Sequence, residues 1–330
     1  MHKYRKGKDM LNYEGFVQEL KEKVAGKLGE GYRVCMEKRK KVNFGLVDAL
    51  AIADMGSARS PVPVFYPGLL FRQYREGAGL EAIAEETVRT YHRHRKEGRD
   101  AAVSAGDISD YGKIKGKLYF RLVHTETNRE LLTGVPHFEV LDLSMVFYVL
   151  LLENEGGTGA VMADSRLLEN WGITPEELRE QAERNSPGLL PAKVECLSHM
   201  MQGILGKRPE TVAGAGVEGN FAWKGETDFP LVLTNARMLD GFAAVLYPGV
   251  LKGMADRMGT DFYVLPSSRH EALLLPADFP AGSGELREMV REVNKTAVAQ
   301  EDILSDSVYY YDRQGNELRM EGEEGKCVRL

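Results

Sequence analysis

The sequence predicts an α+β fold of mixed, mostly antiparallel sheets with helices packed on one face. Strand-like segments in the last third of the chain are joined by short connections, which favour antiparallel pairing. Segments with apolar residues at helical spacing alternate with them. The 330 residues, 43% hydrophobic and 28% charged, are typical of a folded soluble protein. This length favours two lobes, because single cores tend to stop growing at about 250–300 residues.

We expect a first α+β lobe over residues 10–105, after a basic extension at 1–9. Apolar residues between positions 16 and 28 recur at helical spacing, and a glycine follows at position 29. Alternation over 32–40 predicts a strand, and prolines keep 61–66 extended. A second helix is predicted from Leu80, and its end is rich in basic residues at 92–96, where cations favour a helix terminus.

The polar stretch 98–110 is the expected boundary, and a second α+β lobe follows over 106–312. Residues 118–123 read as a strand. The apolar segment Phe138–Leu152 reads as a central strand buried on both faces, with a buried helix as the alternative. A further strand is expected at 160–163. Thr174 and Glu177 form a capping box that starts a helix.

The last third of the chain is predicted to form a β-β-α-β-β-α unit after a flexible excursion at 203–228. Its expected strands, helices and closing hairpin lie at 231–234, 242–246, 251–258, 262–265, 272–275, 286–293, 308–312 and 317–320. Asp240-Gly241 is the turn signal for the first strand pair. Residues 313–330 are expected to form the end of the closing hairpin and a tail.

Charge, cysteines and hydropathy predict a cytoplasmic protein with no membrane partner. The chain has 43 basic and 49 acidic residues, a net charge of -6, and its first hundred residues have 20 basic against 14 acidic. The three scattered cysteines are typical of a reducing compartment. No signal peptide is recognised, and the longest apolar run, Met145–Leu152, is far shorter than the ~20 residues of a membrane span.

Familiar cofactor and metal motifs are incomplete, so no cofactor and no metal is predicted. Gly214–Gly219 matches G-x-G-x-x-G but lacks the strand before it and the helix after it that a dinucleotide site needs. His270-Glu271 lacks a second histidine four residues after the first, because Leu274 stands there. His137 and Glu139 match the H-x-E of zinc deaminases, without the paired cysteines.

The strongest catalytic candidates are Ser267, Ser268, His270 and Glu271, with Asn235 from the neighbouring predicted hairpin. A hydroxyl beside an imidazole is the arrangement that activates a serine nucleophile. The competing interpretation is structural: the serines satisfy turn backbone groups, and His270 and Glu271 pair locally. The sequence favours this structural role.

A third candidate surface is the basic run Lys38–Lys41, together with the cationic end of the second helix. Such a run could bind a polyanion. It lacks the interleaved aromatic residues of a base-stacking surface, and lysines also protect edge strands from pairing. Binding to nucleic acid is therefore disfavoured.

Several ordered phrases in the chain resemble a family of domains of unknown function found in clostridia and other gut Firmicutes. The phrases are Val135–Ser144, Leu233–Asn235, Leu246–Leu251, Leu265–Glu271 and Leu304–Tyr311. The similarity runs from about Met10 to Asp312, so residues 1–9 and 313–330 are expected to be additions and Met10 an alternative start. The resemblance implies a bacterial cytoplasmic protein and no particular activity.

These observations leave three functional hypotheses open. The leading one is a binding or regulatory module with a protein or small-molecule partner, because no catalytic motif is complete. The alternatives are a hydrolase-like enzyme that uses the cluster at 267–271, and a polyanion-binding protein that uses the basic first lobe.

Overall fold

The computed structural model describes residues 10–56, 64–99, 105–154, 157–198, 230–323 and 325–330. The expected extension at 1–9, the excursion at 203–228 and the glycine motif at 214–219 lie outside these residues. The chain divides into two compact units. Unit 1 comprises Met1–Tyr111 and Leu151–Gly159, and unit 2 comprises Gly112–Leu150 and Ala160–Leu330.

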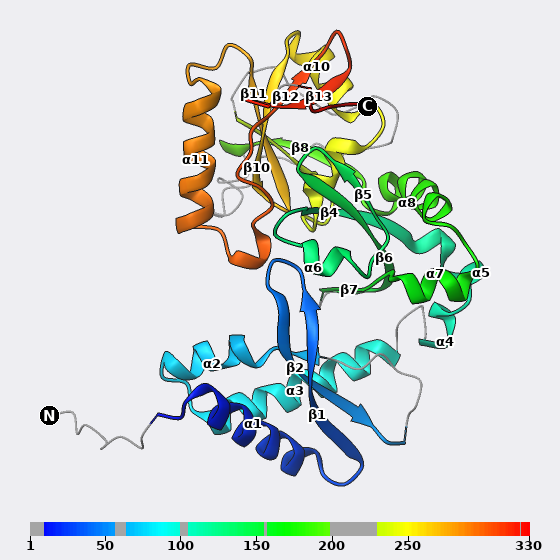
Figure 1. Cartoon of the computed structure of the whole chain (residues 1–330), viewed down its shortest axis with the longest axis vertical. Helices are drawn as coiled ribbons and strands as arrows, with labels where there is room; N and C mark the ends of the chain where they lie inside the picture. The colour runs from blue at the N-terminus through cyan, green and yellow to red at the C-terminus, as the bar shows by residue number, and fades with distance from the viewer. Residues whose placement is uncertain (1–9, 57–63, 100–104, 155–156, 199–229, 324) are drawn as a thin grey trace, which may run out of the picture. The chain divides into compact units, whose positions relative to one another are not determined.

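Unit 1 is a small antiparallel sheet with a helical layer on one face (Figure 1). Its elements are α1 (Tyr13–Leu28), β1 (Tyr32–Lys41), β2 (Gly45–Asp54), β3 (Val64–Phe65), α2 (Pro67–Arg75), α3 (Leu80–Arg99) and α4 (Ala105–Ile108), and the strand order is β1-β2-β3. Phe16 and Leu20 of α1 pack with Leu50 of β2 and Ile83 of α3 in its core. The predicted first helix is confirmed, and Gly29 ends it at a φ of 81°.

The first sheet of unit 2, which lies mainly but not wholly within that unit, is built around one buried strand. It contains β4 (Leu118–His124), β5 (His137–Val140), β6 (Leu143–Asn154) and β7 (Gly157–Met162), with β6 paired to the other three. Short helical segments precede and interrupt it: α5 (Tyr111–Ile114), η1 (Lys115–Lys117) and α6 (Arg129–Leu132). The segment predicted as one strand divides at Leu141, whose φ of 61° turns the chain. Val146 and Phe147 are both fully buried, so β6 is covered on both faces as predicted.

Two helices follow this sheet, α7 (Ser165–Trp171) and α8 (Pro175–Leu189). The Thr174 side chain and the Glu177 side chain form the predicted capping box at the start of α8. The Ser186 hydroxyl accepts a hydrogen bond from the Phe120 N–H at 3.1 Å, so α8 is fixed against β4.

A seven-stranded antiparallel sheet forms the rest of unit 2, in the order β14-β13-β12-β10-β11-β9-β8. Its strands are β8 (Ala192–Cys196), β9 (Leu231–Asn235), β10 (Phe262–Ser268), β11 (Glu271–Pro276), β12 (Tyr309–Asp312), β13 (Glu317–Met320) and β14 (Cys327–Arg329). Its helical segments are η2 (Gly241–Leu246), α10 (Val250–Met258), α11 (Ser283–Thr296) and η3 (Gln300–Asp302). The predicted closing hairpin is confirmed as β12 and β13.

The strand predicted at 242–246 is wrong, because these residues form the 3₁₀ helix η2. Gly241–Val245 are all buried, and a short run that is apolar on every side has no alternation to distinguish a strand from a buried helix. Asp240 precedes η2 with a φ of 53°, a left-handed conformation that redirects the chain. The β-β-α-β-β-α order is therefore β-η-α-β-β-α.

Helical segments cover both faces of this sheet. Leu265 and Leu275 pack on α11, whereas Phe242 of η2 contacts the ring of Tyr309 on the opposite face, with 6.1 Å between ring centroids. The α+β class with antiparallel sheets is thus confirmed, but its helices are not confined to one face of the large sheet. None of the helices in the described ranges is long and apolar enough to span a bilayer.

Candidate functional site

The sequence-predicted catalytic residues meet at the turn between β10 and β11. The Ser267 hydroxyl donates to Glu271 Oε1 at 3.1 Å, and the Ser268 hydroxyl accepts from the backbone N–H of His270 at 3.0 Å. Both hydroxyls therefore have partners within their own turn. Neither of these contacts involves the imidazole ring of His270.

Asn235 lies at the end of β9, next to this turn, but its side chain serves its own loop. Its amide donates to the Leu239 carbonyl at 2.7 Å, and its side-chain oxygen accepts from the Arg237 N–H at 3.0 Å. The preceding residue makes the link to the turn: the Thr234 hydroxyl donates to the His270 carbonyl at 2.7 Å. The predicted residues are neighbours, and their functional groups do not converge.

The His270 ring is held from both sides. Its Nδ1 accepts from the backbone N–H of Asp240 at 3.0 Å, and its Nε2 lies 3.0 Å from Asp302 Oδ1. A backbone N–H can only donate, so Nδ1 is the acceptor and the proton of the neutral ring sits on Nε2. The Nδ1 lone pair, which a general base would use, therefore already accepts a hydrogen bond from the backbone of Asp240, the residue before η2.

An alternating chain of ions surrounds this ring, and sequence reasoning missed most of it. Arg121 Nε lies 2.9 Å from Asp240 Oδ2, and Arg269 Nη1 lies 2.9 Å from Asp240 Oδ1. Arg269 Nε then lies 2.9 Å from Asp302 Oδ1, the same oxygen that His270 contacts. Asp240 is only 4% exposed at its side chain. Such a buried carboxylate needs both arginines, because an unpaired buried charge is very costly.

The directions in which the pKa values of Asp302 and Arg121 shift agree with the geometry of this chain of ions. Burial raises the pKa of Asp302, but hydrogen bonds from Arg269 and His270 outweigh it and lower the pKa overall. Burial alone would lower the pKa of Arg121. Asp240 and the neighbouring tyrosines outweigh burial, so the pKa is raised above its ordinary value. Asp302 and Arg121 are therefore both charged at neutral pH.

Tyrosines line the buried end of the ion chain. The Arg121 guanidinium lies 3.9 Å from the ring centroid of Tyr148 and its Nε 3.0 Å from the Tyr119 hydroxyl. Burial raises the pKa of Tyr148 to about 12, so its phenol stays neutral. The Tyr247 hydroxyl is buried without a hydrogen-bond partner among the described residues. One sequence signal pointed here: Arg121 is a lone charge inside the apolar strand Leu118–Val123, and a buried charge needs a partner.

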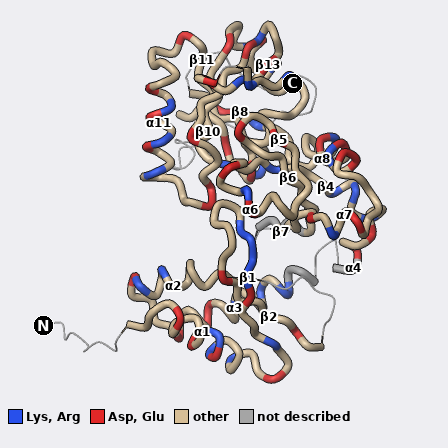
Figure 2. The backbone as a smooth tube through the Cα atoms, in the orientation of Figure 1, with Lys and Arg blue, Asp and Glu red and all other residues tan. Residues whose placement is uncertain are grey.

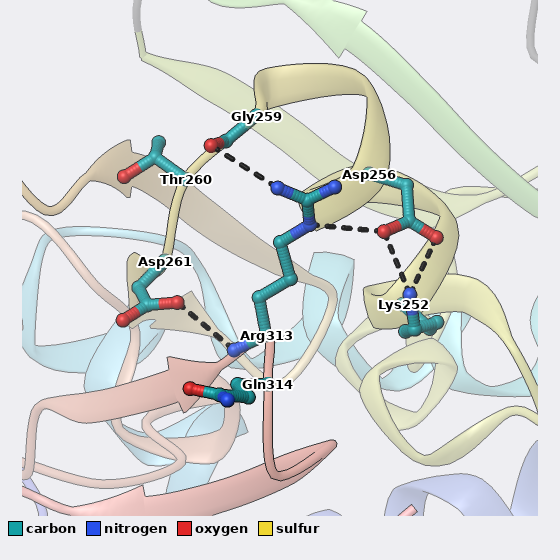
Figure 3. A pocket seen from close by; sticks show the side chains of 7 residues that line it. All are labelled: Lys252, Asp256, Gly259, Thr260, Asp261, Arg313 and Gln314. Atoms are coloured by element: carbon teal, nitrogen blue, oxygen red, sulfur yellow. Dashed lines mark hydrogen bonds and ion pairs between the residues drawn. The ribbon is translucent and has the colours of Figure 1, made fainter.

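The structure also has an open polar depression, which the sequence did not predict (Figure 3). Its volume is about 630 Å³, and it is lined by Lys252, Asp256, Gly259, Thr260, Asp261, Arg313 and Gln314. The lining residues come from α10, from the segment between α10 and β10, and from the turn between β12 and β13. The whole depression lies within unit 2.

Arg313 ties the walls of the depression together. Its Nε contacts Asp256 Oδ1 at 3.0 Å, its Nη1 donates to the Gly259 carbonyl at 3.3 Å, and its backbone N–H donates to Asp261 at 2.9 Å (Figure 3). The Lys252 ammonium contacts both oxygens of Asp256, at 2.7 and 2.6 Å. Arg313 lies in the turn of the predicted closing hairpin, so the hairpin could be found from sequence but its position over α10 could not.

Metal and polyanion chemistry have weaker support. In the described ranges, no group of three or more His, Cys, Asp or Glu side chains could hold a metal ion. The basic run Lys38–Lys41 lies at the end of β1 (Figure 2), where Lys38 pairs with Asp48 at 2.7 Å and Arg39 with Glu37 at 2.5 Å. Lys41 lies over the rings of Phe44 and Tyr66. Nearby carboxylates and aromatic rings thus contact most of these basic side chains.

Comparison with known proteins identifies a family without a known function. A family of unknown function (DUF5688) matches residues 13–313. No curated protein and no solved structure matches.

Proposed function

Because the chain belongs to the DUF5688 family of unknown function, we propose its role from geometry alone: a binding module that takes a small polar molecule in the depression of unit 2. The observation that carries the proposal is the depression lined by Lys252, Asp256, Asp261 and Arg313. Its volume of about 630 Å³ is in the range of small-molecule sites. Its charged lining favours a polar ligand over the apolar ligands that most pockets take.

The geometry at His270 supports binding over hydrolysis. Activating a serine requires an imidazole nitrogen free to accept the hydroxyl proton. The His270 Nδ1 accepts from the Asp240 N–H, and Nε2 faces Asp302. The hydrolase hypothesis would need this turn to rearrange before His270 could reach Ser267 or Ser268.

The setting that we propose is the bacterial cytoplasm. The family resemblance in the sequence motivates the bacterial origin. Cys35 and Cys327 are free thiols, which agrees with a reducing compartment.

The test is ligand screening with a variant of the depression. We expect some members of a panel of amino acids, peptides, sugars, nucleotides and organic acids to shift the backbone amide signals of Thr260 and Gln314 in NMR titrations. Arg313→Gln should weaken that binding at least about fivefold, because it loses the cation that ties the walls. Arg129→Gln is the matched control, since Arg129 forms an exposed ion pair with Glu126 at 2.7 Å and does not line the depression.

Two results would overturn the proposal. One is a panel in which no compound perturbs the signals of the depression. The other is turnover of a general hydrolase substrate that His270→Ala abolishes while the variant stays folded.

A further inference from the structure

We infer that the ligand of the depression is a zwitterion, such as an amino acid or a short peptide, with its anionic group at Lys252 and Arg313 and its ammonium at Asp261. This inference rests on the proposed binding function and adds the ligand class. The lining has two cations, Lys252 and Arg313, and two anions, Asp256 and Asp261. The total charge is zero, but the charges are unevenly distributed.

The side where Arg313 contacts α10 has one positive charge in excess. Lys252 and Arg313 share the single carboxylate of Asp256, with contacts of 2.6 to 3.0 Å. Their hydrogen bonds outweigh burial and lower the pKa of Asp256, so this carboxylate is ionised and neutralises only one of the two cations. A ligand carboxylate or phosphate would neutralise the other, and both cationic side chains are partly exposed, 44% for Lys252 and 42% for Arg313.

The opposite side, at the start of β10, has one negative charge in excess. Asp261 accepts from the Tyr310 hydroxyl at 2.9 Å and from the Arg313 backbone N–H at 2.9 Å. Both donors are neutral: burial and the contact with Asp261 raise the pKa of Tyr310 to about 12, so its phenol is not ionised. Across the described ranges, no Lys, Arg or His forms an ion pair with Asp261. A ligand ammonium would supply the missing cation.

Neutral residues also line the depression and fit the polar middle of such a molecule. The Gly259 carbonyl, the Thr260 hydroxyl and the Gln314 amide line the depression beside the charged side chains (Figure 3). An amide has one donor and one acceptor, and these groups offer complements to both. A ligand with a single charge would leave one end of the depression without a counterion. A dipolar ligand satisfies both ends at once.

The experiment uses glycylglycine and two blocked forms of it as probes. N-acetyl-glycylglycine lacks the ammonium, and glycylglycinamide lacks the carboxylate, while the backbone stays the same. We follow the amide signals of Thr260 and Gln314 of the full chain by NMR titration. Each blocked form should bind at least about fivefold more weakly than glycylglycine, since a lost charge-assisted contact at a partly exposed site is worth roughly this factor.

The Asp261→Asn variant tests whether Asp261 is the partner of the ligand ammonium. In this variant we expect glycylglycine and N-acetyl-glycylglycine to bind equally, because the carboxylate that distinguishes them is gone; the two changes are then non-additive, as for groups in direct contact. Arg313→Gln should instead remove the preference over glycylglycinamide. Retained preferences in both variants would overturn the inference.

The outcomes also separate this inference from the proposed function. If sugars or singly charged acids perturb the depression and the zwitterion binds no better than its blocked forms, the zwitterion inference fails and the binding function stands. If no probe and no panel compound perturbs it, both fail.

Discussion

The guanidinium of Arg121 and the carboxylate of Asp240 form a buried ion pair, with 2.9 Å between Nε and Oδ2 and side chains that are only 14% and 4% exposed. Arg121 lies on β4 of the first sheet, and Asp240 lies in the turn that enters η2 beside the large sheet. The pair therefore joins the two sheets of unit 2. Asp142 makes a second such connection, since it accepts from the Ser305 and Tyr309 hydroxyls at 2.6 and 2.7 Å.

Replacing Asp240 by asparagine should destabilise unit 2 by about 3 kcal/mol, because the buried Arg121 loses its counterion while the side chain keeps its shape. Asparagine tolerates the left-handed φ of 53° at this position, so backbone strain does not contribute. Urea unfolding monitored by tryptophan fluorescence measures the change. Adding Arg121→Met should recover part of the loss, since the unpaired charge is then gone. A single variant within about 0.5 kcal/mol of the wild type would contradict the assigned role.

Gly241 should tolerate no side chain at all. A Cβ at this position would overlap the Thr234 hydroxyl and the His270 carbonyl, and would lie 2.8 Å from the Asn235 backbone nitrogen. Because two of these atoms belong to backbone, Gly241→Ala should cost more than about 3 kcal/mol of unfolding free energy or prevent unit 2 from folding. Gly253→Ala is the matched control: it lies inside α10 with open space around it, and should stabilise by about 0.5–1 kcal/mol. Equal changes in unfolding free energy at the two glycines would refute the close approach of Gly241 to Thr234 and His270.

Local patterns in the sequence were enough to predict elements whose structure depends on nearby residues. The helix that ends at Gly29, the capping box of Thr174 and Glu177 and the closing hairpin are all confirmed. In each of them the deciding contacts lie within a few residues. The failure at 242–246 has the opposite cause, since burial by distant elements, not local periodicity, decides the conformation of η2.

Local sequence patterns were equally limited in predicting the candidate site. The serines, His270 and Glu271 are neighbours in sequence, and in the structure they contact one another around one turn. The partners of the His270 ring, Asp240 and Asp302, lie about 30 residues away on either side. No periodicity encodes such contacts. The depression likewise forms only when the turn after β12 packs on α10.

The tautomer of His270 can be observed directly. Because the Asp240 N–H occupies Nδ1, we expect the neutral ring to be protonated at Nε2. Long-range ¹⁵N–¹H spectra of the imidazole distinguish the two tautomers. Ser267→Ala should leave this spectrum unchanged, since that hydroxyl contacts Glu271 instead of the ring. A ring protonated at Nδ1, or one whose spectrum depends on Ser267, would favour the hydrolase hypothesis.

Asp302 should make stability depend on pH in the acid range. Arg269 and His270 lower its pKa in the folded protein despite the opposing effect of burial. The unfolded chain therefore binds the proton more readily. The stabilisation is complete above the ordinary aspartate value of about 4 and is lost as the pH falls through the lowered folded value. Asp302→Asn should thus be less stable than the wild type at pH 5, and the difference should shrink towards pH 2.5.

Urea unfolding at several pH values between these limits measures that difference. Asp278→Asn serves as the control, because Asp278 is an exposed carboxylate on the same unit, and its difference from the wild type should change little. The direction in which the stability difference between the wild type and Asp302→Asn changes with pH is decisive. If the gap between wild type and Asp302→Asn widened as the pH fell, Asp302 would have a raised folded pKa, and the ion chain from Arg121 to His270 would not hold it in its charged form.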